Sequence, residues 1–245
     1  MGTEQDLKRT SWLIKQLYAP DAFARRDETD DKIFYSVDRF VEHLDSVALA
    51  TVERVVGSLV VEKEPVILDL MASWDSHIPP NTKPSSVTGI GLNKNELAGN
   101  PALTQYLVHD LNDNPFLPLP DDTFDAVLNT VSIDYMTQPV EIFREVGRVL
   151  KPNGVFLVIF SNRMFPQKVV KAWWRMNEEE RVTFVEELFK YVDMFDPPKT
   201  FVSRNKARPP DDKHAHLGIP SDPVYVVYAD KKGPYPLPRP ELLDD

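Results

Sequence analysis

Five short runs of apolar residues along the middle of the sequence constrain the fold more than any other feature. They read PVILDL (65–70), SVTGIGL (86–92), QYLVHDL (105–111), FDAVLNTVSI (124–133) and GVFLVIFS (154–161). None alternates apolar with polar residues, as a half-exposed strand would. Such runs are typical of strands buried on both faces of a parallel sheet. The sequence therefore predicts an α/β fold with a doubly wound, mostly parallel sheet.

Helices are predicted around these strands. In residues 31–61 a helical spacing predicts one or two amphipathic helices before the first strand. The residues that follow this spacing are Val37, Phe40, Val41, Leu44, Val47 and Ala48. Pro139 suits the first position of a helix that ends at KPNG (151–154). A long helix or a helical pair is expected over 167–192, and PVYVVYAD (223–230) is typical of a last strand.

A chain of 245 residues suits one α/β domain with a full core. We expect residues 1–62 to form an N-terminal helical segment that packs on this core. Residues 63–230 are expected to form the α/β domain itself. The proline-rich residues 231–245 are expected to form an extended or disordered tail.

The charge balance indicates which partners to expect. The 28 basic and 38 acidic residues give a formal charge of -10, which repels nucleic acid and anionic lipid. We therefore expect a small-molecule partner, with no nucleic acid and no membrane. The N-terminus lacks the pattern of a signal peptide. The absence of cysteine excludes disulfides and thiolate nucleophiles and suits the cytoplasm or another reducing soluble compartment. No cluster of His, Asp and Glu has metal-ligand spacing in the sequence, so no metal is expected.

Residues 110–160 contain a series of motifs in a fixed order: Asp110, LPLPDDTFDAV (117–127) and RVLKPNG (148–154). This series resembles that of the class I S-adenosylmethionine-dependent methyltransferases, in particular the type 11 group. The resemblance implies a Rossmann-like, mostly parallel seven-stranded sheet with an antiparallel last strand and N-terminal helices. It also implies methyl transfer from S-adenosylmethionine to a small or medium-sized acceptor, with S-adenosylhomocysteine as the product.

The sequence departs from this family at the loop after the first strand. The family has D-x-G-x-G-x-G, and this chain has DLMASWD (69–75). Asp69 matches the leading acid, whereas Met71, Ser73 and Asp75 replace the glycines. A Cβ atom at these positions obstructs close approach of the backbone to a ligand and disfavours positive φ. Three prolines at 79, 80 and 84 leave room for about one turn of the helix that normally follows.

A second departure lies at the end of the second strand. Gly91 stands where the family has an acid that binds the ribose hydroxyls of the cofactor. If the ribose lies where the family binds it, an aspartate at residue 91 should preserve or improve cofactor affinity.

Two interpretations of the glycine-free loop follow. Either Trp74 fills the crevice and the fold is a scaffold, or the loop takes another path. In the second case Ala72 and Ser73 are the small residues, and Trp74 or His77 lines a reshaped pocket. We favour the second, because DLMASWDSHIP (69–79) and GLNKNELAGNP (91–101) together resemble a subset of the same family.

Ligands of open parallel sheets lie beyond the carboxyl ends of the strands. The expected cofactor-binding residues are Asp69, Ala72, Ser73, Trp74, Asn93, Asp110, Leu111 and Asn129. By the resemblance, Asp110 pairs with the adenine amino group. Asp69 either orients its loop or contacts the ligand. Asn93 either caps the following helix or contacts the ribose.

A catalytic base is required only if the acceptor is a hydroxyl or a protonated amine, because alignment alone drives much of this transfer. His77 and Tyr135 are the candidates. Tyr35 is a candidate to close over the ligand, and His43 is expected to lie half-buried on a helix face with Phe40. The favoured function is methyl transfer. The alternative is a non-catalytic methyltransferase-like binding or scaffold protein with a filled crevice.

Overall fold

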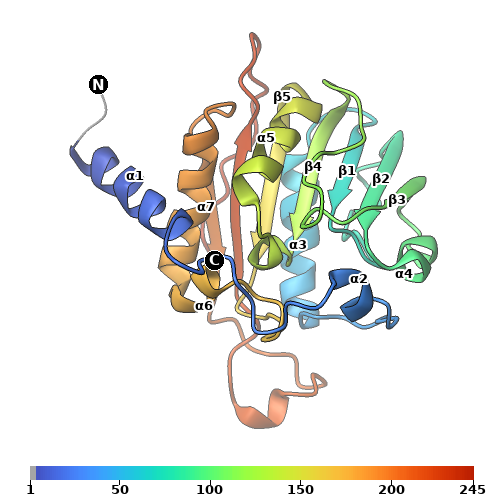
Figure 1. Cartoon of the computed structure of the whole chain (residues 1–245). Helices are drawn as coiled ribbons and strands as arrows, with labels where there is room; N and C mark the ends of the chain where they lie inside the picture. The colour runs from blue at the N-terminus through green and yellow to red at the C-terminus, as the bar shows by residue number, and fades with distance from the viewer. Residues whose placement is uncertain (1–3) are drawn as a thin grey trace.

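The computed structural model describes residues 4–245 (Figure 1). The helices are α1 (Glu4–Leu17), α2 (Asp31–Phe34), α3 (Ser46–Leu59), α4 (Lys94–Gly99), α5 (Pro139–Val149), α6 (Lys171–Arg175) and α7 (Glu178–Val192). The strands are β1 (Val66–Leu70), β2 (Ser86–Gly91), β3 (Gln105–Val108), β4 (Phe124–Thr130), β5 (Leu150–Phe160), β6 (Lys199–Ser203) and β7 (Val224–Asp230). Two 3-10 turns, η1 (Ile133–Tyr135) and η2 (Ala215–Leu217), complete the set.

All the strands belong to one seven-stranded sheet with the order β3-β2-β1-β4-β5-β7-β6. The first five pair in parallel, while β7 runs antiparallel to both β5 and β6. The strand order reverses between β1 and β4, whose residues 67–69 and 126–128 lie in register. The predicted α/β fold, with its mostly parallel sheet and antiparallel last strand, is confirmed.

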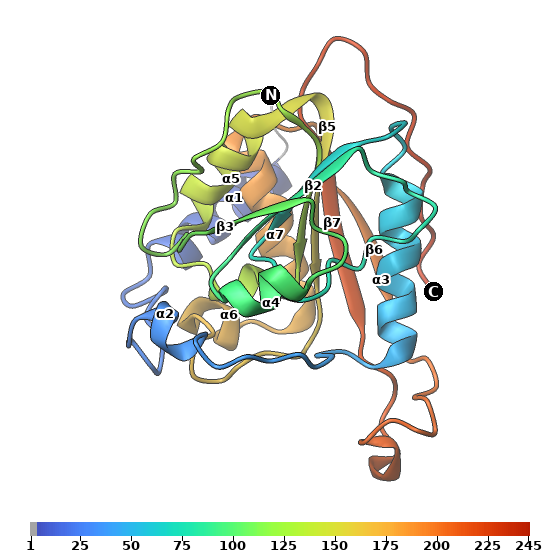
Figure 2. The ribbon, with the colours of Figure 1, turned by 90° about the vertical axis from the view of Figure 1, so that its right-hand side faces the viewer.

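Helices cover both faces of the sheet (Figure 2). On one face α5 and α7 pack on the strands, and α1 lies outside them through the buried Leu13. On the other face α3 packs over β1, β4, β5 and β7 through a second apolar cluster that includes Val52 and Val56. The sheet therefore has an apolar layer on each side. No helix within residues 4–245 is long and apolar enough to span a membrane.

The predicted helical stripe in residues 31–61 is only partly right. Helix α3 begins at Ser46, because the Asp45 carboxylate accepts hydrogen bonds from the backbone N–H groups of Val47 and Ala48. Residues 36–45 are irregular, and Phe40 and its neighbours at 37 and 41 are exposed rather than packed. The backbone of this segment bonds to other elements instead of to a helix of its own. His43 consequently does not lie on a helix face.

One strand differs from its expected environment. We expected β3 to be buried on both faces, but it lies at the edge of the sheet, and Val108 is 52% exposed. Elsewhere the predictions are confirmed: Pro139 opens α5, the region 167–192 holds the pair α6 and α7, and β7 follows. Strand β5 begins at Leu150, so KPNG is already part of it.

The chain after β7 returns across the face that carries α3 (Figure 2). The Arg239 guanidinium is buried and pairs with Glu62 and Asp230. Further on, Asp245 N donates to Val202 O, and Arg204 N donates to Asp245 O. The tail is thus extended and covers the exposed edge of β6, which would otherwise present unpaired backbone groups.

Candidate functional site

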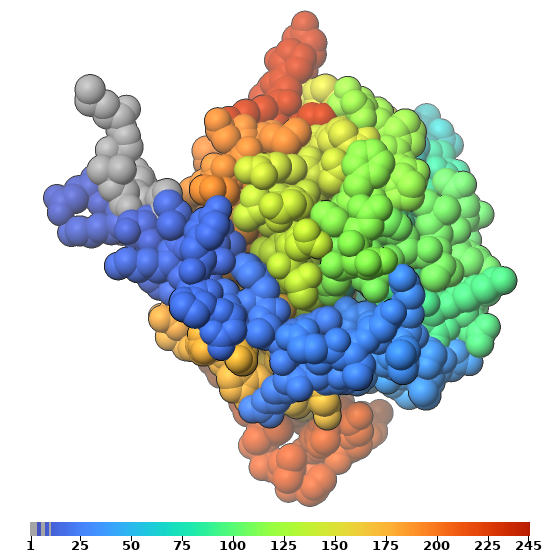
Figure 3. All heavy atoms as spheres, viewed as in Figure 1, coloured from blue at the N-terminus to red at the C-terminus, as the bar shows by residue number. Residues whose placement is uncertain are grey.

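A cavity lies at the carboxyl ends of β1, β2, β3 and β4, where the strand order reverses. Its floor includes the residues that end or follow these strands, such as Asp69, Gly91 and Asp110. Its cover comes from residues between 31 and 44 and from Phe165. We call the whole segment 25–45 the roof segment. Figure 3 shows the roof segment, in blue, spread over this end of the molecule. This is the position in which doubly wound folds bind nucleotides.

The structure brings most of the predicted site residues to this cavity. Its walls include Asp69, Ala72, Ser73, Trp74, Asn93, Asp110 and Leu111, together with Tyr35, His43, His77 and Tyr135. Asn129 is the exception. It is fully buried, and its side-chain amide donates to Leu70 O (3.2 Å) and Ser132 Oγ (2.7 Å). Asn129 therefore ties β4 to β1 behind the cavity rather than lining it.

The loop after β1 adopts a left-handed turn without glycine. Met71, at the first glycine position of the family pattern, has φ 61°. The loop then turns toward β2, where Ala72 N donates to Ile90 O at 2.6 Å. No helix forms in residues 71–85, in agreement with the three prolines there. Trp74 lies on the cavity wall, and its indole N–H donates to Val41 O of the roof segment at 3.2 Å.

This path explains Gly91 and overturns one expectation. A Cβ atom at residue 91 would lie 2.2 Å from Ala72 O, well inside van der Waals contact. An aspartate there would displace the loop, so it cannot restore the acid of the family pattern.

Side chains hold this loop where the family uses glycine backbone. Asn100 donates to Ser73 O and to Ser76 Oγ, both at 2.9 Å. Ser76 Oγ in turn donates to Asp69 Oδ2 at 2.6 Å, and Ser73 Oγ donates to Glu96 Oε2 at 2.6 Å. The polar residues of α4 and its C-cap therefore fix the loop against the floor of the cavity.

Asp69 is the most strongly perturbed acid of the cavity floor. Burial raises its pKa to about 7, against the opposing effect of its hydrogen bond from Ser76. Desolvation destabilises a charged carboxylate when no cation compensates it. Asp69 thus both orients the loop and faces the cavity.

The two carboxylate oxygens of Asp110 differ: one has a structural role and the other is free. Its Oδ1 accepts from the backbone N–H groups of Asn112 (2.9 Å) and Asp113 (3.4 Å), which closes the turn after β3. Its Oδ2 has no hydrogen-bond partner in the part of the chain that the structure describes. The turn therefore holds one carboxylate oxygen free at the cavity wall.

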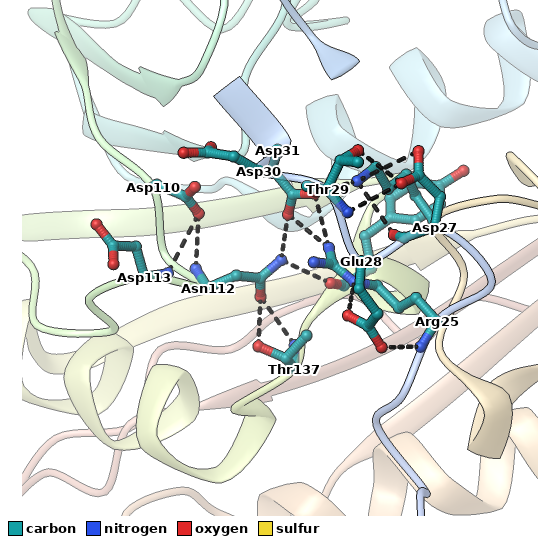
Figure 4. A network of polar contacts seen from close by, with 12 residues as sticks. Arg25, Asp27, Glu28, Thr29, Asp30, Asp31, Asp110, Asn112, Asp113 and Thr137 are labelled. Carbon is teal, nitrogen blue, oxygen red and sulfur yellow. Dashed lines mark hydrogen bonds and ion pairs between the residues drawn. The ribbon is translucent and has the colours of Figure 1, made fainter. Parts of the chain in front are cut away.

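A buried network fastens the roof segment beside Asp110 (Figure 4). Arg25 donates to both oxygens of Asp31, and Lys168, fully buried, pairs with Asp31 at 3.1 Å. Asn112 Nδ2 donates to Asp31 Oδ2 and to Tyr135 O, both at 2.9 Å. Sequence reasoning missed these residues. They come from distant parts of the chain, and no local motif marks them.

Asn93 acts as the N-cap of α4. Its Oδ1 accepts from the N–H groups of Asn95 (2.8 Å) and Glu96 (3.0 Å), and its Nδ2 donates to Tyr35 O and Asp38 Oδ1. The capping interpretation is confirmed. Both polar atoms of its amide are engaged, which leaves no free donor for a ribose.

His77 lies on the cavity wall in an unusual backbone conformation, with φ 51°. Its Nδ1 is 3.3 Å from Asp75 Oδ2, and Glu42 of the roof segment lies close by. Burial alone would lower the pKa of His77, but the hydrogen bond and charge of Asp75, helped by Glu42, raise it. The pair Asp75 and His77 has the arrangement of a histidine base oriented by a carboxylate.

The side chains of Glu42, Asp75 and His77 also bear on the expectation that the chain has no metal-binding cluster. Ligand atoms of Glu42, Asp75 and His77 lie within 4.8 Å of one another, so the fold assembles a group with metal-ligand character that the sequence spacing did not indicate. The ion pair between Asp75 and His77 accounts for much of this grouping without a cation.

Tyr135, the other candidate base, already forms a hydrogen bond within the protein. Its hydroxyl oxygen accepts from Phe165 N at 2.7 Å, and burial raises its pKa well above the ordinary value. Tyr35 packs against Phe34 and Phe165, and burial raises its pKa as well. Both tyrosines therefore help to hold the cover of the cavity and are poor proton acceptors.

Comparison with known proteins supports the resemblance to a methyltransferase family. Residues 78–158 match the model of the type 11 methyltransferase domain. Over these residues the chain is similar to the type 11 group of the class I methyltransferases. This match begins just after the glycine-free loop and includes β2 to β5 of the methyltransferase fold.

Curated relatives match over parts of this chain. It is 34% identical over 105 residues to a fatty-acid O-methyltransferase of Mycolicibacterium smegmatis, over 41% of this chain and 36% of that protein. It is also 30% identical over 66 residues to a malonyl-[acyl-carrier protein] O-methyltransferase of Marinomonas sp. This match covers 27% of this chain and 24% of that protein. The chain thus spans about a third or less of the length of these relatives.

A solved structure supports the same fold. It comes from Thermotoga maritima and is described as a SAM-dependent methyltransferase, possibly a histamine N-methyltransferase. Its TM-score is 0.54 at 15% identity, over 78% of this chain and 91% of that one.

Proposed function

We propose that this chain binds S-adenosylmethionine in the cavity and transfers its methyl group to a small or medium-sized acceptor. The observation that carries this proposal is the cavity at the switch point of the sheet, with a free carboxylate oxygen of Asp110 on its wall. The match of residues 78–158 to the type 11 methyltransferase domain and the names of the matching relatives support it. When bound, the sulfonium supplies an activated methyl group.

The residues on the cavity wall suit the parts of this cofactor. Asp110 Oδ2 is free to accept from the adenine amino group, and Leu111 offers an apolar surface for the ring. Asp69, Ala72, Ser73 and Trp74 are placed to surround the methionine part. The loop meets it with side chains rather than with glycine backbone, so affinity is expected in the range of tens of micromolar or weaker.

The acceptor is expected to lie against the apolar wall formed by Leu44, Leu49 and Phe165, near His77. If the acceptor is a hydroxyl or an ammonium group, His77 accepts its proton while Asp75 fixes the imidazole through Nδ1. Tyr135 does not share this role, because its hydroxyl is occupied. The formal charge of -10 and the lack of cysteine favour a small-molecule acceptor and a reducing soluble compartment.

Calorimetric titration with S-adenosylhomocysteine tests the proposal. The wild type should bind it, and Asp110→Ala should reduce the affinity at least tenfold, since a charge-assisted hydrogen bond contributes about 1.5–3 kcal/mol. Asp113→Ala is the matched control, because this neighbouring carboxylate is 72% exposed and, within residues 4–245, pairs only with Lys32. The control should bind like the wild type.

Two outcomes contradict the proposal. Absence of both heat and thermal stabilisation at millimolar ligand would favour the alternative, a non-catalytic binding or scaffold protein. An Asp110→Ala variant that binds as tightly as the wild type would show that the cofactor does not use this wall.

A further inference from the structure

Glu96 is a buried carboxylate on the cavity wall without a cationic partner. Its side chain is 7% exposed and belongs to the first turn of α4. Among residues 4–245 no Lys, Arg or His forms an ion pair with it. Burying an unpaired charge is costly, so such a group normally has a bound ligand or a dense set of donors.

The protein supplies only part of the hydrogen bonding that this carboxylate can accept. Oε2 accepts from Ser73 Oγ at 2.6 Å, and Oε1 accepts from Arg39 N at 2.7 Å. A carboxylate has about four acceptor sites. These two donors come from the glycine-free loop and from the roof segment, and they hold the group rigidly while each oxygen keeps acceptor capacity.

The residues at the end of β2 cannot supply an acid that accepts hydrogen bonds from a ribose. In doubly wound folds an acid after the second strand accepts hydrogen bonds from the ribose of a bound nucleoside. At the end of β2, Gly91 has no room for a side chain and Leu92 is apolar. Both polar atoms of the Asn93 amide are already bonded. Glu96 is therefore the acid that this end of β2 presents to the cavity.

We propose that Glu96 binds the vicinal hydroxyls of the cofactor ribose, in place of an acid at residue 91. The inference rests on the proposed cofactor site. It explains why the loop passes so close to Gly91: the acid stands five residues further along the chain, in the first turn of α4 instead of at the end of β2, and Ser73, at a former glycine position, orients it. The glycine-free loop and the missing strand-end acid are then two parts of one rearranged site.

The test combines a protein variant with an altered ligand. S-adenosylhomocysteine and its 2′-deoxy and 3′-deoxy analogues are titrated into the wild type and into Glu96→Gln, and the affinity ratios are compared. Loss of one hydroxyl should weaken binding to the wild type about tenfold or more, as expected for a hydrogen bond to a charged group. In Glu96→Gln the parent ligand should bind about 10- to 100-fold more weakly, and the ratio between parent and deoxy ligands should fall to within about threefold.

Asp38→Asn is the matched control. Asp38 accepts hydrogen bonds from Asn93 and Asn95 and so holds the same part of the roof segment, without belonging to the cavity wall. If Glu96→Gln acted only by loosening the roof segment, both variants would lose affinity for all three ligands alike. The inference requires that Asp38→Asn keep the wild-type ratio.

The outcomes separate this inference from the proposed function. Wild-type binding of S-adenosylhomocysteine without discrimination against the deoxy analogues overturns the role of Glu96 and leaves the cofactor site intact. A Glu96→Gln variant that still discriminates overturns it as well. Absence of any wild-type binding overturns both. If Glu96→Gln fails to fold, Glu96→Asp takes its place: the shorter carboxylate should lower the ratio between parent and deoxy ligands, and an unchanged ratio overturns the inference.

Discussion

Replacement of Asp69 by asparagine should stabilise the protein in a pH-dependent manner. Asp69 is 4% exposed, its only side-chain donor among the described residues is Ser76 Oγ, and burial raises its pKa to about 7. Asparagine has the same shape and can still accept the hydrogen bond from Ser76. The substitution therefore removes a buried titrating group with little change in packing.

The magnitude follows from the pKa in the two states. The ordinary value is 3.8, so between about pH 4 and pH 7 the native protein retains a proton that the unfolded chain has lost. Native stability falls as pH rises through this window and stays lower above it. At about 1.4 kcal/mol for each pH unit the full cost is about 4 kcal/mol, of which about 3 kcal/mol arises between about pH 5 and pH 8.

Urea unfolding of the wild type and of Asp69→Asn at about pH 5 and pH 8 measures this difference. The advantage of the variant over the wild type should grow by about 3 kcal/mol between the two conditions. Asp134, whose pKa burial also raises to about 7, contributes equally to both proteins and cancels. Asp75→Asn is the control of opposite sign, because the hydrogen bond with His77 lowers the pKa of Asp75 and its carboxylate stabilises the native state at neutral pH. An advantage that changes by less than about 1 kcal/mol would refute the argument.

Three further substitutions test the contacts around the cavity and the tail. Gly91→Ala should lower the free energy of unfolding by about 1–3 kcal/mol, measured in urea, because its Cβ atom would meet Ala72 O at 2.2 Å; an unchanged midpoint contradicts the loop path. Asp31→Asn should leave Lys168 without its buried ion pair, cost about 3–5 kcal/mol and speed amide exchange in the roof segment; unchanged exchange contradicts the fastening role. Arg239→Leu should lower the thermal midpoint by several degrees, since two carboxylates lose their partner; wild-type melting would show that the tail contributes nothing.

The sequence predicted the sheet well because each buried strand carries its own signal. The apolar runs at 66–70 and 124–130 are explained by burial on both faces, and they lie side by side as expected. The edge position of β3 was not predicted, because the sequence pattern of an apolar run does not distinguish an edge strand from a central one. The helical spacing in residues 36–45 was misleading, because contacts with α4 and Trp74 override local preference there.

The candidate site was predicted in part for a similar reason. Residues at the ends of strands or just after them, such as Asp69 and Asp110, could be placed from the order of the strands alone. The network of Arg25, Asp31 and Lys168 joins distant segments and has no local pattern. The orientation of Glu96 depends on the path of a loop that the family pattern does not describe.

The fastening of the roof segment has a consequence for the kinetics of ligand exchange. Arg25 and Lys168 hold Asp31 through ion pairs that are almost wholly buried, so any opening of the roof segment at Asp31 has to break them. If the proposed ligand enters by such an opening, its association should be slower than the diffusional ceiling of about 10⁸–10⁹ M⁻¹s⁻¹, and its residence time should be long. For the proposed methyl transfer, release of product rather than chemistry would then set the turnover rate, as in many enzymes that close over their substrates. The same slow exchange favours growing crystals with ligand present over soaking it into crystals already formed.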